Sequence, residues 1–347
     1  MTTRLPIPYT DNVENPPSDE KEDIRAVVET VKEMLEKVSE QTGRFERANH
    51  VKATGCASGT FQVLPNLPPE LAQGIFARER KFSASVRFSN AASQPQADLL
   101  PDGRGMAIKL HDVGQETLMP DVDGTQSQDF VMVNHPVFVV PDVKEYLKLE
   151  RALSAEKLEQ IKLLGKAFTG GQWNPLNWHW REFDAIREVN TRLPTNPANI
   201  TYFSMAPIRF GNYVAKYRAK PADEHSKAIL DFVRNLGTPS DALRRMLIET
   251  LRLHPIQYVF QVQLRTSSET MPVEDALAEW PESESPYRTV AQLELPIQEI
   301  DSEEKAAAAD RQSFNVWHAI GEHRPLGGIN RLRGEVYPVS ADWRLKK

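Results

Sequence analysis

The amino-acid sequence predicts an α+β protein, in which an antiparallel β-sheet or barrel is flanked by helices. Two observations favour this class. Short strand-like segments are separated by loops rich in Gly, Pro, Asp and Gln, without the regular alternation of strands and helices that builds a parallel sheet. Longer segments with helical periodicity stand before, between and after the groups of strands.

The elements are expected in the following order. Residues 1–17 are rich in Pro and Asn and predict an extended arm, and residues 19–41 predict an amphipathic helix because apolar residues recur at helical spacing. Strands are expected at 59–63, 82–88, 105–110, 130–133, 200–203, 213–217, 256–265 and 287–295, with helices at 147–168, 222–236 and 241–251. A tight turn at Gly327-Gly328 leads into a last helix over 330–337. We divide the chain into an N-terminal arm and helix, 1–43, and one large domain, 44–347.

Composition excludes several classes of function. Apolar residues at 40% and charged residues at 26% are ordinary for a globular protein of 347 residues. A formal charge of −6 argues against nucleic acid as a partner, because phosphate binding needs a basic surface. No apolar run is long enough for a membrane span, and the N-terminus lacks the apolar core of a signal peptide. Since Cys56 is the one cysteine, no internal disulfide forms, and we expect a cytoplasmic protein.

The C-terminal segment carries a tyrosine beside an arginine. On the expected helix, Arg333 and Tyr337 stand at i and i+4, so both lie on one face. A free phenol has a pKa of about 10. Bound ferric iron and a guanidinium one turn away both favour the phenolate, and tyrosine is a known axial ligand of haem iron. Taken alone, this spacing is better explained by an exposed helix with an ordinary Arg/Tyr pair.

Further motifs, taken in order along the chain, resemble those of catalases. They are Arg47-x-x-His50, Arg87-Phe88-Ser89, Arg104-Gly105-Met106-Ala107-Ile108-Lys109-Leu110, the block Asp129–Phe138, and Arg333-x-x-x-Tyr337-Pro338 with Arg344 seven residues after the tyrosine. In the family, the Arg-x-x-His motif lies on a strand above the haem. The resemblance covers about 44–147 well and 314–344 moderately, and it is weaker in the middle of the chain.

This resemblance implies a catalase-like antiparallel β-barrel with flanking helices, and a b-type haem held against it by a C-terminal helix. Tyr337 would be the axial ligand of the ferric iron, with Arg333 beside it, and His50 the distal acid/base. The remaining residues implied are Arg47, Arg87 and Arg344 for the haem propionates, and Phe138 and Tyr146 for the distal pocket. Since the chain stops ten residues after Tyr337, we expect the family's wrapping segment and C-terminal helical domain to be absent. The nicotinamide dinucleotide and the intertwined tetramer are therefore not carried over, and homo-oligomer formation stays open.

The chain departs from the family at two positions near the expected pocket. An ungapped match places Val133 where catalases have their distal Asn, and Asn134 matches the following Asn. Asn134 is thus a candidate catalytic amide whose role is open. Asn49 stands where catalases have Val before the distal His, and its amide is able to bond the imidazole or a ligand.

Three functions follow, in order of preference. The first is a haem peroxidase that reduces organic hydroperoxides, and hydrogen peroxide less well, with an external electron donor. The second is a small true catalase that dismutates hydrogen peroxide, and the third is a fatty-acid hydroperoxide isomerase or lyase. A haem sensor or carrier is a weaker alternative, because it would not need a distal acid/base.

Overall fold

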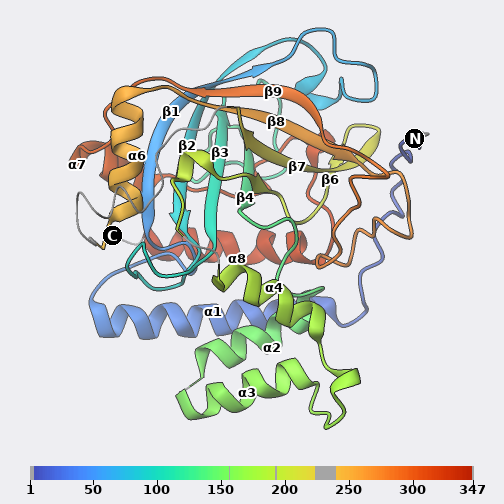
Figure 1. Ribbon diagram of the computed structural model, residues 1–347, viewed down its shortest axis with the longest axis vertical. Coiled ribbons are helices and arrows are strands. Elements are labelled where there is room, and N and C mark those ends of the chain that lie inside the picture. Colours follow the sequence, from blue (N-terminus) through green and yellow to red (C-terminus); the bar gives the residue numbers. More distant parts are fainter. Residues whose placement is uncertain (1–3, 156, 192–193, 223–239, 346–347) are drawn as a thin grey trace.

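The computed structural model describes residues 4–155, 157–191, 194–222 and 240–345. Within these ranges the strands are β1 (Ala53–Val63), β2 (Lys81–Asn90), β3 (Arg104–His111), β4 (Ser127–Val133), β5 (Tyr202–Phe203), β6 (Ile208–Phe210), β7 (Tyr213–Pro221), β8 (Ile256–Leu264) and β9 (Arg288–Leu295). They pair in the order β5-β4-β3-β2-β1-β9-β8-β7-β6. Because β5 also pairs with β7, eight of them close into an antiparallel barrel (Figure 1). The predicted fold class is confirmed.

Aromatic side chains fill the barrel interior. Since side chains alternate between the two faces of a strand, β2 sends Phe82, Ala84, Val86 and Phe88 inward. The rings of Phe130 and Phe260 meet there with centroids 4.7 Å apart. Rings of this size bury large apolar areas, so their packing is the main source of stability for the barrel.

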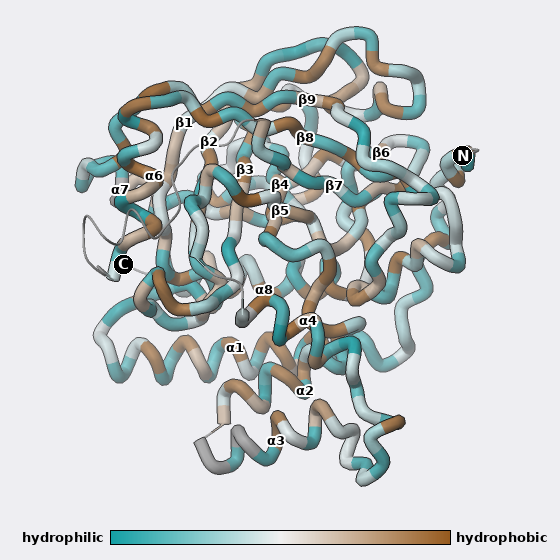
Figure 2. Tube along the Cα trace, viewed as in Figure 1, coloured by the Kyte–Doolittle hydropathy of each residue, from teal (hydrophilic) through white to brown (hydrophobic). Residues whose placement is uncertain are grey.

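The helices of the described residues lie outside the barrel. They are α1 (Glu20–Thr42), α2 (Val143–Ser154), α3 (Lys157–Thr169), α4 (Trp180–Thr191), α6 (Ala242–Leu253), α7 (Glu303–Arg311) and α8 (Gly328–Arg344). In Figure 1, α8 crosses one end of the barrel, with α1 and then α2 and α3 beyond it. The apolar stripe of α1 recurs once per turn in Figure 2, and Val27, Val31 and Leu35 bury it against α2 and α8.

The N-terminal arm fixes the start of α8. Gly327 takes φ +84°, and a Cβ there would lie 2.5 Å from the Val273 carbonyl oxygen, so glycine is required at this turn. The Glu14 carboxylate accepts from the Gly327 N–H at 2.8 Å, and Arg331 pairs with both Glu14 and Glu20. Carboxylates at a helix N-terminus also suit its positive dipole end, so these contacts hold α8 at a defined place on the barrel.

Some expected elements differ from those observed. The prediction of a single helix at 147–168 is wrong, because the chain forms two helices there, α2 and α3. Helix α2 ends where Ala155 takes an extended backbone conformation (ψ 160°). The last helix is longer than expected, running from Gly328 through Pro338 to Arg344. Helices α4 and α7 and strand β6 were not predicted. All but the first residue of the expected helix at 222–236 lies outside the described residues.

No helix in the part of the chain that the structure describes has the length and apolar character to cross a bilayer.

Candidate haem-binding site

A cavity lies on the outer face of the barrel, between β2–β4 and α8. Two rows of paired residues form its floor: Arg87, Ala107 and Val131 in one row, and Ser89 and Gly105 in the next. Their neighbours Phe88 and Ile108 point the other way, into the core. Because Gly105 and Ala107 have little or no side chain, the helix leaves empty space of about 720 Å³, open mouth included, above this part of the sheet.

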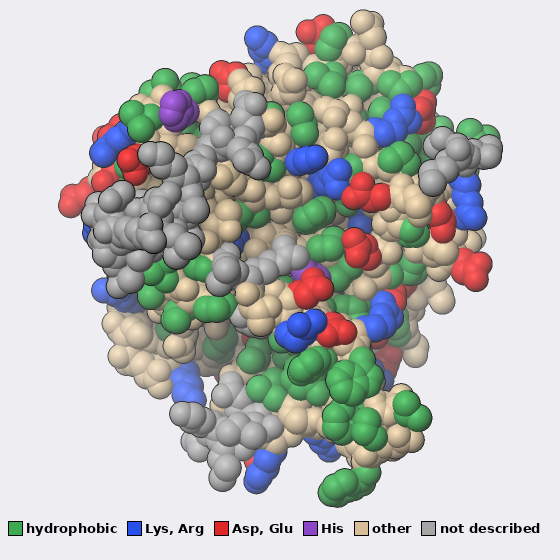
Figure 3. Space-filling view, viewed as in Figure 1, with side chains coloured by type: hydrophobic (Ala, Val, Ile, Leu, Met, Phe, Trp, Pro, Cys, Tyr) green, Lys and Arg blue, Asp and Glu red, His purple; other side chains and the backbone are tan. Residues whose placement is uncertain are grey.

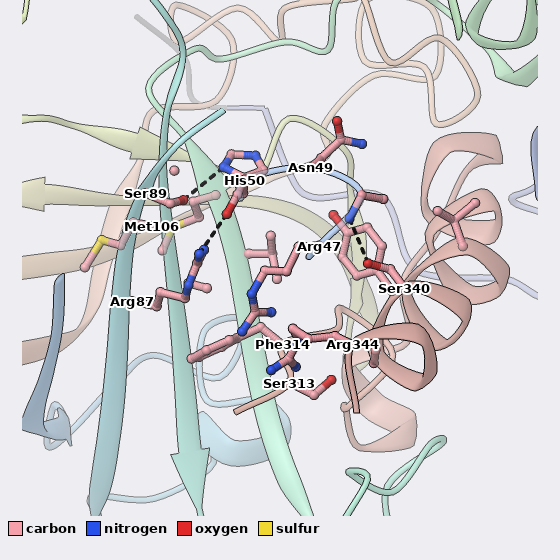
Figure 4. Close-up of a pocket in the computed structure, with 18 residues that line it drawn as sticks. Arg47, Asn49, His50, Arg87, Ser89, Met106, Ser313, Phe314, Ser340 and Arg344 are labelled. Atoms are coloured by element: carbon pink, nitrogen blue, oxygen red, sulfur yellow. Dashed lines mark hydrogen bonds between the residues drawn. The ribbon is translucent and has the colours of Figure 1, made fainter. Parts of the chain in front are cut away.

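His50 lines this cavity from the segment before β1, in a strained backbone conformation. The motif Arg47-x-x-His50 was expected on a strand, but β1 begins at Ala53 and His50 takes φ +54°, which a non-glycine residue seldom adopts. Arg87 Nη2 donates to the His50 carbonyl at 2.7 Å, and the imidazole Nδ1 lies 3.0 Å from Ser89 Oγ (Figure 4). Ser89 therefore engages Nδ1 of the imidazole and not Nε2.

Glycine at position 105 allows the imidazole to lie against the sheet. A Cβ on Gly105 would lie 2.6 Å from both Cε1 and Nδ1 of His50. Burial, followed by the positive charges of Arg87, Arg333 and Arg47, lowers the pKa of His50 from about 6.5 to about 3. The ring is therefore neutral near pH 7 and able to accept a proton.

Three guanidinium groups line the same cavity: Arg47 and Arg344 lie side by side, and Arg87 points toward His50 (Figure 4). Arg47 comes from the segment before β1, Arg87 from β2 and Arg344 from α8, and none of them forms an ion pair among the described residues. Arg47 and Arg344 both donate to the Gln312 carbonyl, at 2.8 and 3.1 Å. The Nε of Arg344 is buried without a partner.

These cations disfavour one another's charge. Burial, and then Arg87 and Arg344, lower the pKa of Arg47 from its usual range to about 8. Burial likewise lowers the pKa of both Arg87 and Arg344. Since an arginine is ordinarily charged at any pH that proteins meet, this part of the cavity suits an anion with two or more oxygen acceptors.

One face of α8 closes the cavity. Arg333, Tyr337 and Arg344 follow one another at four and seven residues, so a helix that continues through Pro338 aligns all three. The Arg333 guanidinium donates to Asn330 Oδ1 at 3.1 Å and lies 5.6 Å from the centre of the Phe138 ring. Ser340 Oγ accepts from the Ala48 N–H at 3.0 Å, which ties α8 to the segment that carries His50. Tyr337 is half-buried and faces the cavity.

A second cavity adjoins the first at His50 and Tyr337, which line both. It holds about 1090 Å³ of empty space, open mouth included, and its walls are largely apolar. Phe138 and Tyr146 line it as expected, with ring centroids 5.7 Å apart. Apolar lining with few polar groups is typical of sites for organic ligands.

Two polar side chains in this second cavity lie next to Tyr146: Glu150, to which the sequence gave no role, and Asn49, whose role it left open. Glu150 stands one turn after Tyr146 on α2 and hydrogen-bonds its hydroxyl, and burial raises the pKa of the Glu150 carboxyl. The amide of Asn49 also bonds Tyr146. Burial first, and then the neighbouring Glu150, raise the pKa of Tyr146, so its phenol stays protonated.

The candidate amide and its neighbours have structural partners. Asn134 lines the second cavity, but its Oδ1 accepts from the Arg104 N–H at 2.9 Å. Val133 also lines this cavity. His135 lies with Nδ1 2.8 Å from the Val137 carbonyl and Nε2 3.1 Å from Glu188.

Sequence reasoning missed Ser89 and Phe314 as site residues. Ser89 had a signal, since it stands two residues after Arg87 and therefore on the same face of the strand. Phe314 had no such signal in the sequence, because its position depends on buried contacts with residues about 185 to 205 positions earlier in the chain, Asp129 and Lys109. Asp129 accepts from the Asn315 N–H at 3.0 Å and pairs with Lys109 at 2.9 Å, which places Phe314 in the cavity wall.

The geometry agrees with what the chain resembles in structure. No protein-family model matches the chain, and no curated protein matches its sequence. Among solved structures it is similar to catalase A from Saccharomyces cerevisiae, with a TM-score of 0.66 and 17% identity over 88% of this chain and 62% of that one. A fungal catalase gives a TM-score of 0.64 and 18% identity, over 90% of this chain and 62% of that one. A bacterial catalase gives a TM-score of 0.64 and 15% identity, over 90% of this chain and 60% of that one.

The chain therefore has a catalase-like fold, as the motifs predicted. It spans between 60% and 62% of the length of these three catalases.

Replacing Gly105 with alanine tests how closely His50 is held. The added Cβ would meet the imidazole at 2.6 Å, so we expect Gly105→Ala to lower the free energy of unfolding by about 1–3 kcal/mol. His50→Ala removes the ring, so the double variant is expected to recover much of this loss. Denaturant unfolding of all four proteins measures the coupling. Equal losses with and without the ring would show that His50 does not lie against Gly105.

Proposed function

We propose that this protein is a haem-dependent peroxidase that reduces organic hydroperoxides with electrons from an external donor. One observation carries the proposal. A single cavity brings together a tyrosine on a helix face, a neutral histidine and three guanidiniums that form no ion pair among the residues that the structure describes. The catalase-like fold around that cavity also supports the proposed peroxidase function.

The donor set fits a ferric b-type haem. Tyr337 would hold the iron through its phenolate oxygen, with Arg333 one turn before it on α8. Arg47, Arg87 and Arg344 would bind the two propionates, because guanidinium forms charge-assisted hydrogen bonds to carboxylate. The buried, unpartnered Nε of Arg344 supports this assignment.

His50 would move the proton that peroxide cleavage requires. Reduction of a hydroperoxide to an alcohol and water consumes two electrons and two protons, and the terminal oxygen must lose its proton before the O–O bond breaks. When bound, haem would supply the two electrons for this cleavage, and the external donor would return two electrons to it. The neutral imidazole accepts the proton of the hydroperoxide and returns it to the departing alkoxide oxygen. Ser89 and Arg87 keep the ring in place during both transfers.

The second cavity favours an organic hydroperoxide over hydrogen peroxide. Its wall includes Val133, Phe138 and Leu149, which contact alkyl groups well and offer a small polar substrate little to bond. With its Oδ1 bonded to Arg104, Asn134 has one fewer group for orienting a small peroxide.

Tyr337→Phe tests the axial ligand. We expect the variant to lose the ferric phenolate absorption spectrum and much of its bound haem, because phenylalanine offers no oxygen to the iron. Tyr213→Phe, on β7 outside both cavities, is the matched control and keeps both. Absorption spectra and haem content per chain are the measurements. An unchanged spectrum in Tyr337→Phe would remove this residue as the ligand.

His50→Ala tests the proton shuttle. We expect the spectral change after mixing with hydroperoxide to slow by roughly 10²–10⁴-fold, the usual contribution of general acid–base catalysis, while haem content stays near normal. His135→Gln is the control, since both ring nitrogens of His135 already have protein partners. Stopped-flow absorbance gives the rates. Wild-type speed in His50→Ala with a slow His135→Gln would move the role to His135.

The choice of substrate separates peroxidase from catalase. We expect an aromatic donor to be oxidised faster with an alkyl hydroperoxide than with hydrogen peroxide, because the second cavity contacts the alkyl group. Oxygen release from hydrogen peroxide should be slow. An oxygen electrode and donor absorbance, read on the same haem-loaded sample, decide the matter. Rapid and sustained oxygen release with little donor oxidation would instead identify a small true catalase.

A further inference from the structure

The loop between α3 and α4 exposes large apolar side chains close together. Trp173 is 97% exposed and Leu176 88%, and the first turn of α4 adds Trp180 at 47% and Phe183 at 41%. Apolar groups gather over this loop and α4 at the lower edge of Figure 3. Single exposed apolar residues are normal, but a cluster of this kind marks an interaction surface.

The loop, residues 168–183, is an ordered structure and will be called the aromatic tip. The indole N–H of Trp178 donates to the Gln172 carbonyl at 3.0 Å, and that of Trp180 to the Pro175 carbonyl at 2.8 Å. The Trp180 ring packs against Trp178 in a tilted pair and against Phe183 edge to face, with ring centroids 5.5 and 5.9 Å apart. Because both indole N–H groups are bonded within the tip, these two rings can enter an apolar medium without leaving a donor unsatisfied.

The shape of the tip favours a lipid surface over a protein partner. It projects from the lower end of the molecule in Figure 1, beyond α3 and away from the barrel. A protein interface needs a broad complementary area, whereas a small convex tip enters the interfacial layer of a bilayer, where Trp is enriched. Several charged side chains near the tip are paired, Lys162 with Glu159, Arg181 with Asp275, and Arg187 with Asp184.

The same segments lead to the second cavity. Helix α4 begins in the tip at Trp180, and its last turn places Val189 in the cavity wall. Leu153, at the end of α2, also lines the cavity and is 53% exposed. Apolar residues thus mark both the tip and the entrance to the cavity.

We propose that the aromatic tip inserts into the surface of a lipid bilayer, so that the second cavity receives hydroperoxides of lipid acyl chains from it. The docking rests on the tip alone, whereas the choice of substrate rests on the proposed peroxidase function.

Vesicle binding tests the docking independently of activity. The full-length, haem-loaded protein is mixed with uncharged phosphatidylcholine vesicles and floated on a density gradient, and tryptophan quenching by brominated acyl chains reports insertion. Three of the six tryptophans lie in the tip. We expect binding that changes little with salt, and an at least tenfold weaker partition for Trp173→Ser/Leu176→Ser, since each side chain removed loses the free energy of apolar burial. The matched control, Leu5→Ser/Ile297→Ser, removes two exposed apolar residues elsewhere and should bind as the wild type does.

Three outcomes would overturn the docking proposal. They are wild-type protein that does not float with vesicles, equal binding by the tip variant, and a wild-type oligomer that the tip variant converts to a monomer. The last would identify the tip as a contact between copies of this chain.

Substrate choice is read separately from docking. Against a phospholipid hydroperoxide in vesicles, the tip variant should lose about tenfold in rate, while its rate with a water-soluble alkyl hydroperoxide stays at the wild-type level. Equal rates for wild type and tip variant on the vesicle substrate would overturn delivery from the bilayer. Binding to vesicles without reduction of either substrate would reject the peroxidase function and leave the docking intact.

Discussion

Arg47, Arg87 and Arg344 line one cavity and form no ion pair with any carboxylate in the part of the chain that the structure describes, and much of the surrounding structure serves to hold them there. Burying like charges together is costly, and the lowered pKa of Arg47 expresses that cost. The barrel strands, the segment before β1 and the end of α8 each supply one arginine, so the cluster depends on closing the whole fold. An anion bound to them would offset the repulsion, and we expect it to stabilise the protein by linkage.

The same cluster also helps to position His50 in the cavity. Arg87 bonds the carbonyl of His50, a residue that already holds an unfavourable positive φ, and Ser89 from the same strand bonds its ring. Gly105, on the next strand, leaves the space that the ring occupies. A strained residue held by several independent contacts is typical of a functional position, because strain persists only where its surroundings impose it.

The strands were predicted well, because strand composition is a local property of the sequence. The choice of a barrel rested on the order of motifs along the chain. Prediction failed where the chain reverses without a breaker, as at Ala155, since the helical period of 147–168 continues across the turn. Helix α7 did carry a readable signal: Ser302 caps it by accepting from the Lys305 N–H, and two glutamates follow. Closure of the barrel depends on pairings of β5 with β4 and β7, and a two-residue strand has no reliable signature of its own.

The candidate site was predictable to the extent that motifs carry it. Tyr337, Arg333 and Arg344 share one face because their spacing matches a helix, and the structure extends that helix through Pro338 despite the missing N–H. Phe314 and Glu150 were not predictable, since their positions depend on tertiary contacts: the buried Asp129–Lys109 network for one, and the approach of α2 to α8 for the other.

Polarity divides the space around Tyr337 into two unlike halves. One half is lined by the three arginines and is cationic, whereas the walls of the larger half are largely apolar, with Glu150 and Tyr146 among its few polar groups. A small polar peroxide gains little in the second half, while an alkyl chain gains by leaving water. His50 lines both halves, so a hydroperoxide whose chain occupies the apolar half would present its oxygens to the imidazole. Substrate preference in this protein would then follow from the shape of the apolar half, and proton transfer from the His50 that both halves share.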